Sequence, residues 1–203
     1  MIIAAFEPFG GRRRNRSWEV LERFPPHSGI EQVRLPVDFA RLPEEIEALL
    51  SERPTALLLL GESSDRIVRV EQIALNLADS DLPDNAGARP RMEPLMVSAP
   101  LALQATWSAR AVADRIAADG VPAAPSFHAG TFACNAAFFL ALLGARDRQG
   151  EVVDAPIPVG LLHIPRFCGL LGPSRISLAR AIERAAMALL APPRTSEVGA
   201  TRR

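Results

Sequence analysis

Residues 55–61, with the sequence TALLLLG, form an unbroken apolar run between Pro54 and the polar stretch that begins at Glu62. A strand with one face in water alternates apolar and polar residues, whereas a strand covered on both faces is apolar throughout. Residues 55–61 therefore predict a central strand in a sheet that carries helices on both faces.

Strand and helix patterns alternate along the rest of the chain. Further strands are predicted at residues 1–6, 32–37, 68–77, 122–127 and 157–164. Helices are predicted at residues 17–24, 42–50, 105–119, 134–143 and 174–189, with Ser17 and Ser174 as N-caps of the first and last. This alternation predicts an α/β fold, a three-layer open twisted, mostly parallel sheet with helices on both faces.

The length of 203 residues fits one domain with a well-buried core. We expect this single α/β domain to span residues 1–191, followed by a polar, disordered tail at 192–203. Residues 79–100 contain four prolines and few periodic apolar residues, which predicts a long surface loop. Loops of that length in compact domains are often functional.

Composition excludes several classes of function. Basic and acidic residues number 23 each, so no nucleic-acid or membrane-surface partner is expected. No apolar run approaches the ~20 residues of a membrane span, and the start lacks the features of a signal peptide. These observations predict a cytoplasmic enzyme. All the basic residues are arginine and there is no tyrosine, which excludes Schiff-base lysine and tyrosine acid/base chemistry.

No metal or nucleotide site is predicted either. The three histidines and two cysteines are scattered without the spacing of metal ligands, and two cysteines are too few for a disulfide framework. The glycines at Gly10 and Gly11 lack the G-x-G-x-x-G or G-K-[ST] context of a phosphate-binding loop.

Cys134 stands where a short strand, a glycine-containing turn and an apolar helix meet. A helix N-terminus favours a thiolate, and its free N–H groups can bind an oxyanion. The alternative is that Cys134 is a small buried apolar residue.

Two further residues could complete a catalytic site with this thiol. His163 ends the buried strand 157–164, at the sheet edge where ligands gather in open α/β folds. The alternatives are a histidine with a single hydrogen bond, and His128 as a rival base. Glu71 lies in an apolar strand, where a carboxylate either faces solvent or has a partner. These residues alone leave a Cys–His–acid site open beside the structural interpretations.

Four blocks of sequence then follow one another along the chain. They are FEPFGG at 6–11 with Asn15 and SWEV at 17–20, VEQIALN at 70–76 with LPDNAG at 82–87, AGTFACN at 129–135, and LHIP at 162–165. In this order they resemble the opening, the acidic-residue strand and loop, the nucleophile motif and the histidine motif of the pyroglutamyl peptidase I family of cysteine peptidases.

The resemblance implies a peptidase that removes an N-terminal pyroglutamyl residue from peptides without a cofactor, as a single domain or a homodimer or homotetramer. It implies Cys134 as nucleophile, His163 as base and Glu71 as the residue that orients the base. It also implies a substrate pocket. By the family pattern Phe6, Phe9 and Phe132 sandwich the flat pyrrolidone ring, and Asn15 belongs to the substrate-binding residues.

The chain departs from the family pattern around this site. Gln72 follows the acidic residue where arginine is common, and Asp81 stands where many bacterial members carry an arginine near the oxyanion. Glu62 belongs to a stretch that replaces a glycine-rich segment. An added carboxylate could weaken oxyanion binding, so two alternatives stay open: a hydrolase of another small cyclic or acyl amide, and a non-catalytic homologue that binds pyroglutamyl termini. Cys168, five residues after His163, is expected only to pack.

Overall fold

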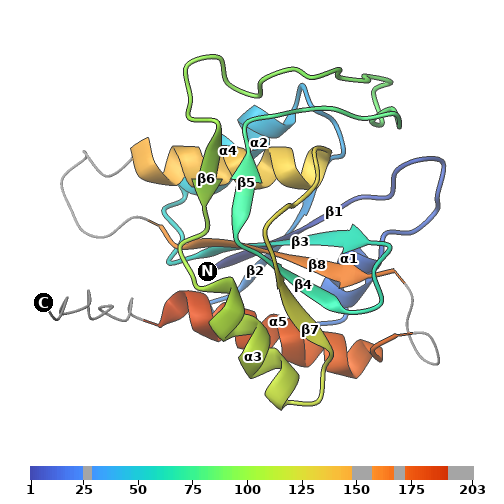
Figure 1. Cartoon of the computed structure of the whole chain (residues 1–203), viewed down its shortest axis with the longest axis vertical. Helices are drawn as coiled ribbons and strands as arrows, with labels where there is room; N and C mark the ends of the chain where they lie inside the picture. Colours follow the sequence, from blue (N-terminus) through green and yellow to red (C-terminus); the bar gives the residue numbers. More distant parts are fainter. Residues whose placement is uncertain (25–28, 148–156, 167–171, 192–203) are drawn as a thin grey trace, which may run out of the picture.

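A six-stranded sheet forms the middle layer of the molecule (Figure 1). The structure is a computed structural model that describes residues 1–24, 29–147, 157–166 and 172–191. The strands of this sheet are β1 (Ile2–Phe6), β2 (Glu31–Leu35), β3 (Leu57–Ser63), β4 (Val68–Glu71), β7 (Ala123–Ser126) and β8 (Val159–Pro165).

The strand order is β2-β1-β3-β8-β4-β7. Strands β2, β1, β3 and β8 run parallel, while β4 is antiparallel to β8 and parallel to β7. The predicted mostly parallel sheet is confirmed. The apolar run provides β3, and residues 57–60 are fully buried because helices cover both faces.

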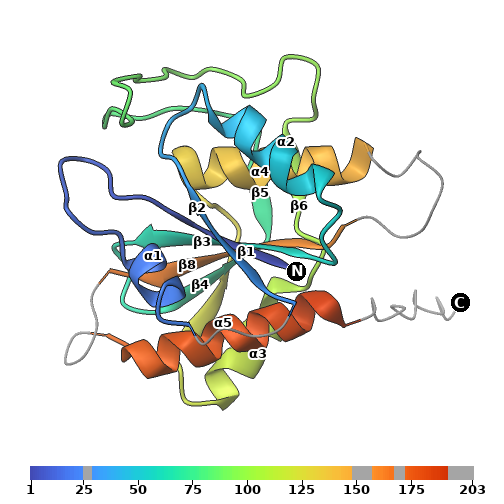
Figure 2. The same cartoon turned by 180° about the vertical axis from the view of Figure 1, so that it is seen from behind.

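Two helices cover one face of the sheet and three cover the other (Figures 1 and 2). Helices α2 (Leu42–Ser51) and α4 (Ala133–Asp147) lie on one side. Helices α1 (Arg16–Leu21), α3 (Ala109–Ala118) and α5 (Arg175–Leu190) lie on the other. The three-layer arrangement predicted from the sequence is therefore confirmed.

The ends of some helices differ from their predicted positions. Asn15, not Ser17, caps α1, because its side-chain oxygen accepts a hydrogen bond from the Ser17 N–H at 3.0 Å. The helix ends at Leu21, before the predicted end at residue 24. Helix α3 starts after Ser108, whose hydroxyl caps it, and not at residue 105. Ser174 caps α5 as predicted.

The single strand predicted at 68–77 is wrong. The chain divides at Gln72 into β4 and a separate strand, β5 (Ile73–Leu75), which pairs antiparallel with β6 (Ala102–Gln104) beside α4 (Figure 1). The division follows from the Gln72 side chain, which donates to the Trp107 carbonyl and accepts from the Ala109 N–H. These bonds tie the segment after β6 to the end of β4.

The loop predicted at residues 79–100 is confirmed, apart from an isolated bridge between Ala78 and Glu93. Within the described ranges, none of the helices has the length and apolar character needed to span a membrane. The division into one domain and a tail stays a prediction, and residues 192–203 lie outside the described part of the chain.

Candidate active site

Cys134 is the second residue of α4, and the segment before it is fastened to the chain near β5. The Thr131 hydroxyl donates to the Asp79 carbonyl at 2.7 Å. The buried side chain of Asn135 accepts from the Leu75 N–H and donates to the Leu75 carbonyl, at 2.8 and 2.9 Å. The first N–H groups of a helix lack partners within it, and Cys134 lies among them at the start of α4.

Gly61 lies directly beneath the thiol and the imidazole. A Cβ atom at Gly61 would lie 2.8 Å from both Cys134 Sγ and His163 Nε2, and 2.6 Å from His163 Cδ2. Two atoms that converge on one point in this way lie on the same side of the sheet and close to each other. Only glycine leaves room for this pair above β3.

The antiparallel pairing of β4 with β8 brings Glu71 to His163. In the register, Arg69 lies opposite His163, and Glu71 is two residues further along the same face. The Glu71 carboxylate reaches back along this diagonal, and its Oε1 lies 2.8 Å from His163 Nδ1. The second oxygen, Oε2, is buried without a hydrogen-bond partner among the described residues, so the carboxylate depends on His163 for its stabilisation.

The surroundings of His163 favour its charged form. Burial disfavours the charge, but hydrogen bonds to Cys134 and Glu71 outweigh it and raise the pKa of His163 to about 10. Nδ1 therefore donates a proton to Glu71, while Nε2 faces the thiol. The arrangement fits a thiol nucleophile, a base and a carboxylate that orients the base.

Trp107 supports the acidic residue of this cluster. Its ring nitrogen donates to the Glu71 carbonyl at 3.0 Å, and its ring lies against Gly160, where a Cβ would approach within 2.6 Å. The Gln72 bonds described above hold the backbone at Trp107 and at Ala109. Gln72 thus has a structural contact in this chain. Sequence reasoning missed Trp107, because the helix predicted at residues 105–119 included it, whereas the observed helix starts only at Ala109.

Aromatic rings gather around Phe132, which precedes Cys134 by two residues. The ring centroids of Phe9 and Phe132 are 5.5 Å apart, and Phe39 contacts Phe132 edge-on at 5.6 Å. Phe39 was not predicted, because no motif in the sequence marks it. Phe6, the third predicted ring, is buried in β1. The Asn15 side chain caps α1 and donates a hydrogen bond to the Glu7 carbonyl.

The remaining motif residues hold the loops that carry these rings. Glu7 accepts hydrogen bonds from the Val37 N–H and from the Asn85 amide. Asp84 accepts from the Phe39 N–H at 2.9 Å. These hydrogen bonds join the first sequence block, which contains Glu7, to the second, which contains Asp84 and Asn85, beside Phe9 and Phe39. They explain why these motif residues, which are far apart in the sequence, occur together in the chain.

The departures from the family pattern have partners of their own. Asp81 forms an ion pair with Arg91, and its side chain is 94% exposed. The Glu62 side chain is 3% exposed and forms ion pairs with Arg12 and Arg166. Neither carboxylate is left uncompensated beside the thiol. These ion pairs weaken the hypothesis of a different cyclic or acyl amide substrate, because it rested in part on the two carboxylates.

The rival base lies apart from this cluster. His128 is exposed, and its ring Nδ1 accepts the Gly130 N–H at 3.1 Å. His27 and Cys168 lie outside the described residues. Among the residues that are described, no three His, Cys, Asp or Glu side chains gather as metal ligands.

The chain is similar in sequence and in fold to known proteins. A family model described as pyroglutamyl peptidase matches residues 1–177. The chain is 37% identical over 170 residues to the pyrrolidone-carboxylate peptidase of Thermococcus kodakarensis, covering 81% of this chain and 80% of the relative. Two solved structures share the fold, the pyrrolidone carboxyl peptidase of Thermus thermophilus and the pyroglutamyl peptidase I of Bacillus amyloliquefaciens. The first has a TM-score of 0.81 at 33% identity over 92% of this chain and 98% of its own. The second has a TM-score of 0.83 at 27% identity over 94% of both chains.

Proposed function

The chain belongs to the pyroglutamyl peptidase family, and from this premise we propose that it hydrolyses the amide bond after an N-terminal pyroglutamyl residue. Cys134 is the nucleophile, His163 the base and Glu71 the residue that orients the base. The observation that carries the proposal is the convergence of Cys134 Sγ and His163 Nε2 above Gly61, with the Nδ1–Oε1 contact of 2.8 Å behind it.

Acylation starts from the thiol and the imidazole. His163 Nε2 takes the thiol proton of Cys134, and the raised pKa of His163, about 10, favours the imidazolium that results. Sγ attacks the pyroglutamyl carbonyl carbon, and the first N–H groups of α4 stabilise the oxyanion. The C–N bond breaks as the His163 Nε2–H protonates the leaving amine, which leaves a thioester.

Deacylation reuses the same groups. His163, now neutral, takes a proton from water, and the hydroxide attacks the thioester carbonyl. The C–S bond breaks, pyroglutamate leaves, and the thiolate–imidazolium pair is restored. Glu71 holds Nδ1 protonated throughout, so that Nε2 stays directed at the reacting atoms.

The aromatic rings provide the binding site for the substrate's ring. Phe9 and Phe132 offer apolar faces to a flat, neutral lactam, and such faces disfavour the charged amino group of an ordinary peptide. The roles implied for Phe6 and Asn15 stay predictions. A homodimer or homotetramer and a cytoplasmic location likewise remain predictions, and light scattering of the purified chain tests the first.

A fluorogenic pyroglutamyl amide tests the proposal. We expect turnover by the wild type and loss of turnover in Cys134→Ala and His163→Gln. His128→Gln is the matched control and should retain activity, because His128 is exposed. Circular dichroism checks that each variant is folded. A folded Cys134→Ala protein with undiminished turnover would contradict the proposal.

A further inference from the structure

A basic pocket lies at the carboxyl ends of β3 and β8, separate from the aromatic site. It has a volume of about 380 Å³. Five arginines line it: Arg12, Arg13, Arg14, Arg16 and Arg166. The lining also contains the carboxylates of Glu19 and Glu62. We call this site the arginine pocket.

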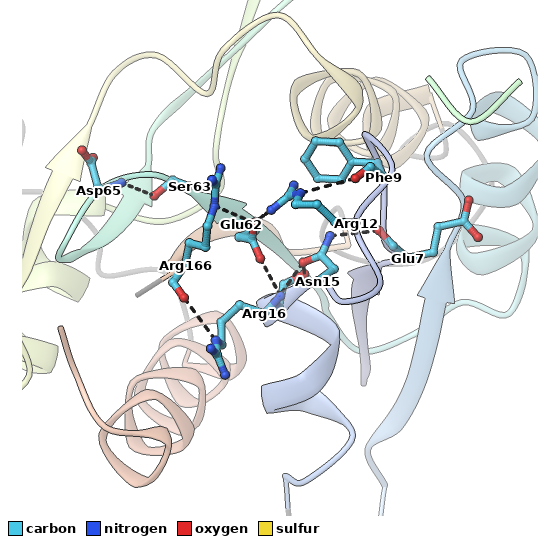
Figure 3. Close-up of polar contacts among 10 residues, drawn as sticks. Glu7, Phe9, Arg12, Asn15, Arg16, Glu62, Ser63, Asp65 and Arg166 are labelled. Carbon is cyan, nitrogen blue, oxygen red and sulfur yellow. Dashed lines mark hydrogen bonds and ion pairs between the residues drawn. The ribbon is translucent and has the colours of Figure 1, made fainter. Parts of the chain in front are cut away.

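Glu62 contacts three of the arginines that line the arginine pocket (Figure 3). One carboxylate oxygen of Glu62 binds the guanidinium groups of Arg12 and Arg166, and the other accepts the Arg16 N–H at 2.7 Å. The Arg16 side chain also donates to the Arg166 carbonyl at 3.3 Å. These contacts hold the loop before α1 against the ends of two central strands, so the positions of the guanidinium groups are set by the fold.

Positive charge remains after the internal pairs are formed. Glu19 forms ion pairs with Arg14 and Arg16, and Glu62 forms ion pairs with Arg12 and Arg166. Five arginines and two glutamates leave a surplus of three positive charges, 5 − 2 = 3. Arg13 is exposed and has no acidic partner among the described residues. The pocket can therefore accept an anionic group without displacing a carboxylate that is already bound.

The arginine pocket adjoins the catalytic pair along both strands. Gly61 lies beneath Cys134 and His163, and Glu62 is the next residue, pointing to the other side of the sheet. Arg12 connects the two sites, since its guanidinium lies 4.2 Å from the centroid of the Phe9 ring while it binds Glu62. An extended peptide spans roughly 3.3 Å per residue, so a group a few residues beyond the scissile bond can cross this edge.

We propose that the arginine pocket binds a carboxylate of the peptide beyond the scissile amide, so that the enzyme prefers acidic pyroglutamyl peptides. The inference rests on the function proposed above and adds a substrate class to it. The carboxylate is either an acidic side chain or the C-terminal α-carboxylate of a short peptide, and both suit the paired N–H groups of arginine. Arg13 and Arg166 are the specificity-determining residues.

The test compares kcat/KM for matched peptides. The first pair is pyroglutamyl-Ala-Glu-Ala amide and its Gln counterpart, and the second is pyroglutamyl-Ala-Ala as free acid and as amide. At low ionic strength we expect the charged member of at least one pair to be preferred by about threefold to tenfold, as several partly exposed charges allow. The preference should fall below about twofold in about 0.5 M salt, where the Debye length is short.

Arginine variants test whether the arginine pocket causes the preference for charged peptides. We expect the double variant Arg13→Gln/Arg166→Gln to lose it, while Arg110→Gln, an exposed arginine on α3, keeps it. Equal kcat/KM within both pairs, or a preference that survives in the double variant, overturns the inference. If no peptide is cleaved, the proposed function fails instead. Calorimetric titration of Cys134→Ala with the same peptides then tests whether the arginine pocket binds a carboxylate. Equal affinity within both pairs overturns the inference.

Discussion

The Cys134–His163–Glu71 triad and the arginine pocket lie at neighbouring strand ends but differ in their access to water. Glu71 is 1% and His163 9% exposed, whereas the side chains of Arg14 and Arg166 are 75% and 46% exposed. Charges interact more strongly where water is excluded, and salt screens them less there. We therefore expect the loss of a charged contact to have a large effect in the triad and a small effect in the arginine pocket.

The two regions also differ in what positions them. The triad stands on β4, β8 and the start of α4, whose backbones are paired or packed in the core. The pocket depends on the loop between β1 and α1, held by Glu62. A change in the triad should consequently reduce the rate by orders of magnitude, and a change in the pocket should alter stability or preference by small factors.

The largest effect is expected for Glu71→Gln. The neutral amide removes the charge that favours the imidazolium and can present an N–H to Nδ1, which reverses the required tautomer. We expect kcat/KM for the fluorogenic pyroglutamyl amide to fall by about 10³-fold, with KM little changed. A decrease in kcat/KM of only a few-fold would show that the buried contact between Glu71 and His163 is not decisive for catalysis.

Gly61→Ala should follow in size. The added Cβ would lie 2.6–2.8 Å from the imidazole and Sγ, which is closer than such atoms can approach, and β3 is held on both sides by β1 and β8. The catalytic side chains must move, and a displacement of that order costs about 10²-fold in rate. Steady-state kinetics with a urea unfolding curve separates this effect from misfolding. Unchanged kinetics in a folded variant would contradict the described convergence.

The pH dependence of stability tests the charge on His163. Its pKa is about 10 in the folded protein and ordinarily about 6.5 in an unfolded chain. Because the folded state holds this proton more tightly, the stabilisation is complete below pH about 6.5 and is lost as the pH rises to about 10. We expect the free energy of unfolding to decrease more steeply over this window in the wild type than in Glu71→Gln. Parallel curves would rule out a raised pKa that depends on Glu71.

Glu62→Gln should act on stability more than on rate. It leaves Arg12 and Arg166 without their shared carboxylate, although both remain partly in water, which limits the loss. We expect about 1–2 kcal/mol lower unfolding free energy, since the Gln side chain can still accept the Arg16 N–H. The urea midpoint, with kcat/KM on the fluorogenic amide, measures both. A rate loss as large as that of Glu71→Gln would place Glu62 with the triad.

Asp81→Asn should give the smallest effect. The Asp81 side chain is almost fully exposed, and its ion pair is with the exposed Arg91. We expect unfolding curves and kcat/KM within error of the wild type. A clear gain in rate would instead indicate that this carboxylate acts on the oxyanion in solution.

The main architecture was predictable because its signals are local. The run at 55–61 marks a two-sided buried strand, apolar stripes mark α2 and α5, and Ser174 marks the start of α5. The break between β4 and β5 was not predictable, because it depends on bonds from Gln72 to residues 35 and 37 positions away. The same holds for β6, which is three residues long and mostly exposed.

The site was predictable to the extent that motifs carry it. Separate blocks marked Cys134, His163 and Glu71, and the fold brings them together. Trp107 and Phe39 were missed because their contacts arise only when distant segments pack. The arginine pocket was missed because Arg166 meets Arg16, the first residue of α1, across 150 positions of sequence.

The strand order has a consequence for the synthesis of the protein. β8 leaves the ribosome after the other described strands of the sheet, yet it lies in the middle of the sheet, between β3 and β4. Until residues 159–165 have emerged, β2-β1-β3 and β4-β7 have no strand to join them, and His163 is missing from the site. The nascent chain therefore holds an unassembled, inactive site until β8 has emerged. Long-range closure of this kind is slow, so the exposed edges of β3 and β4 need protection from aggregation until β8 pairs with them.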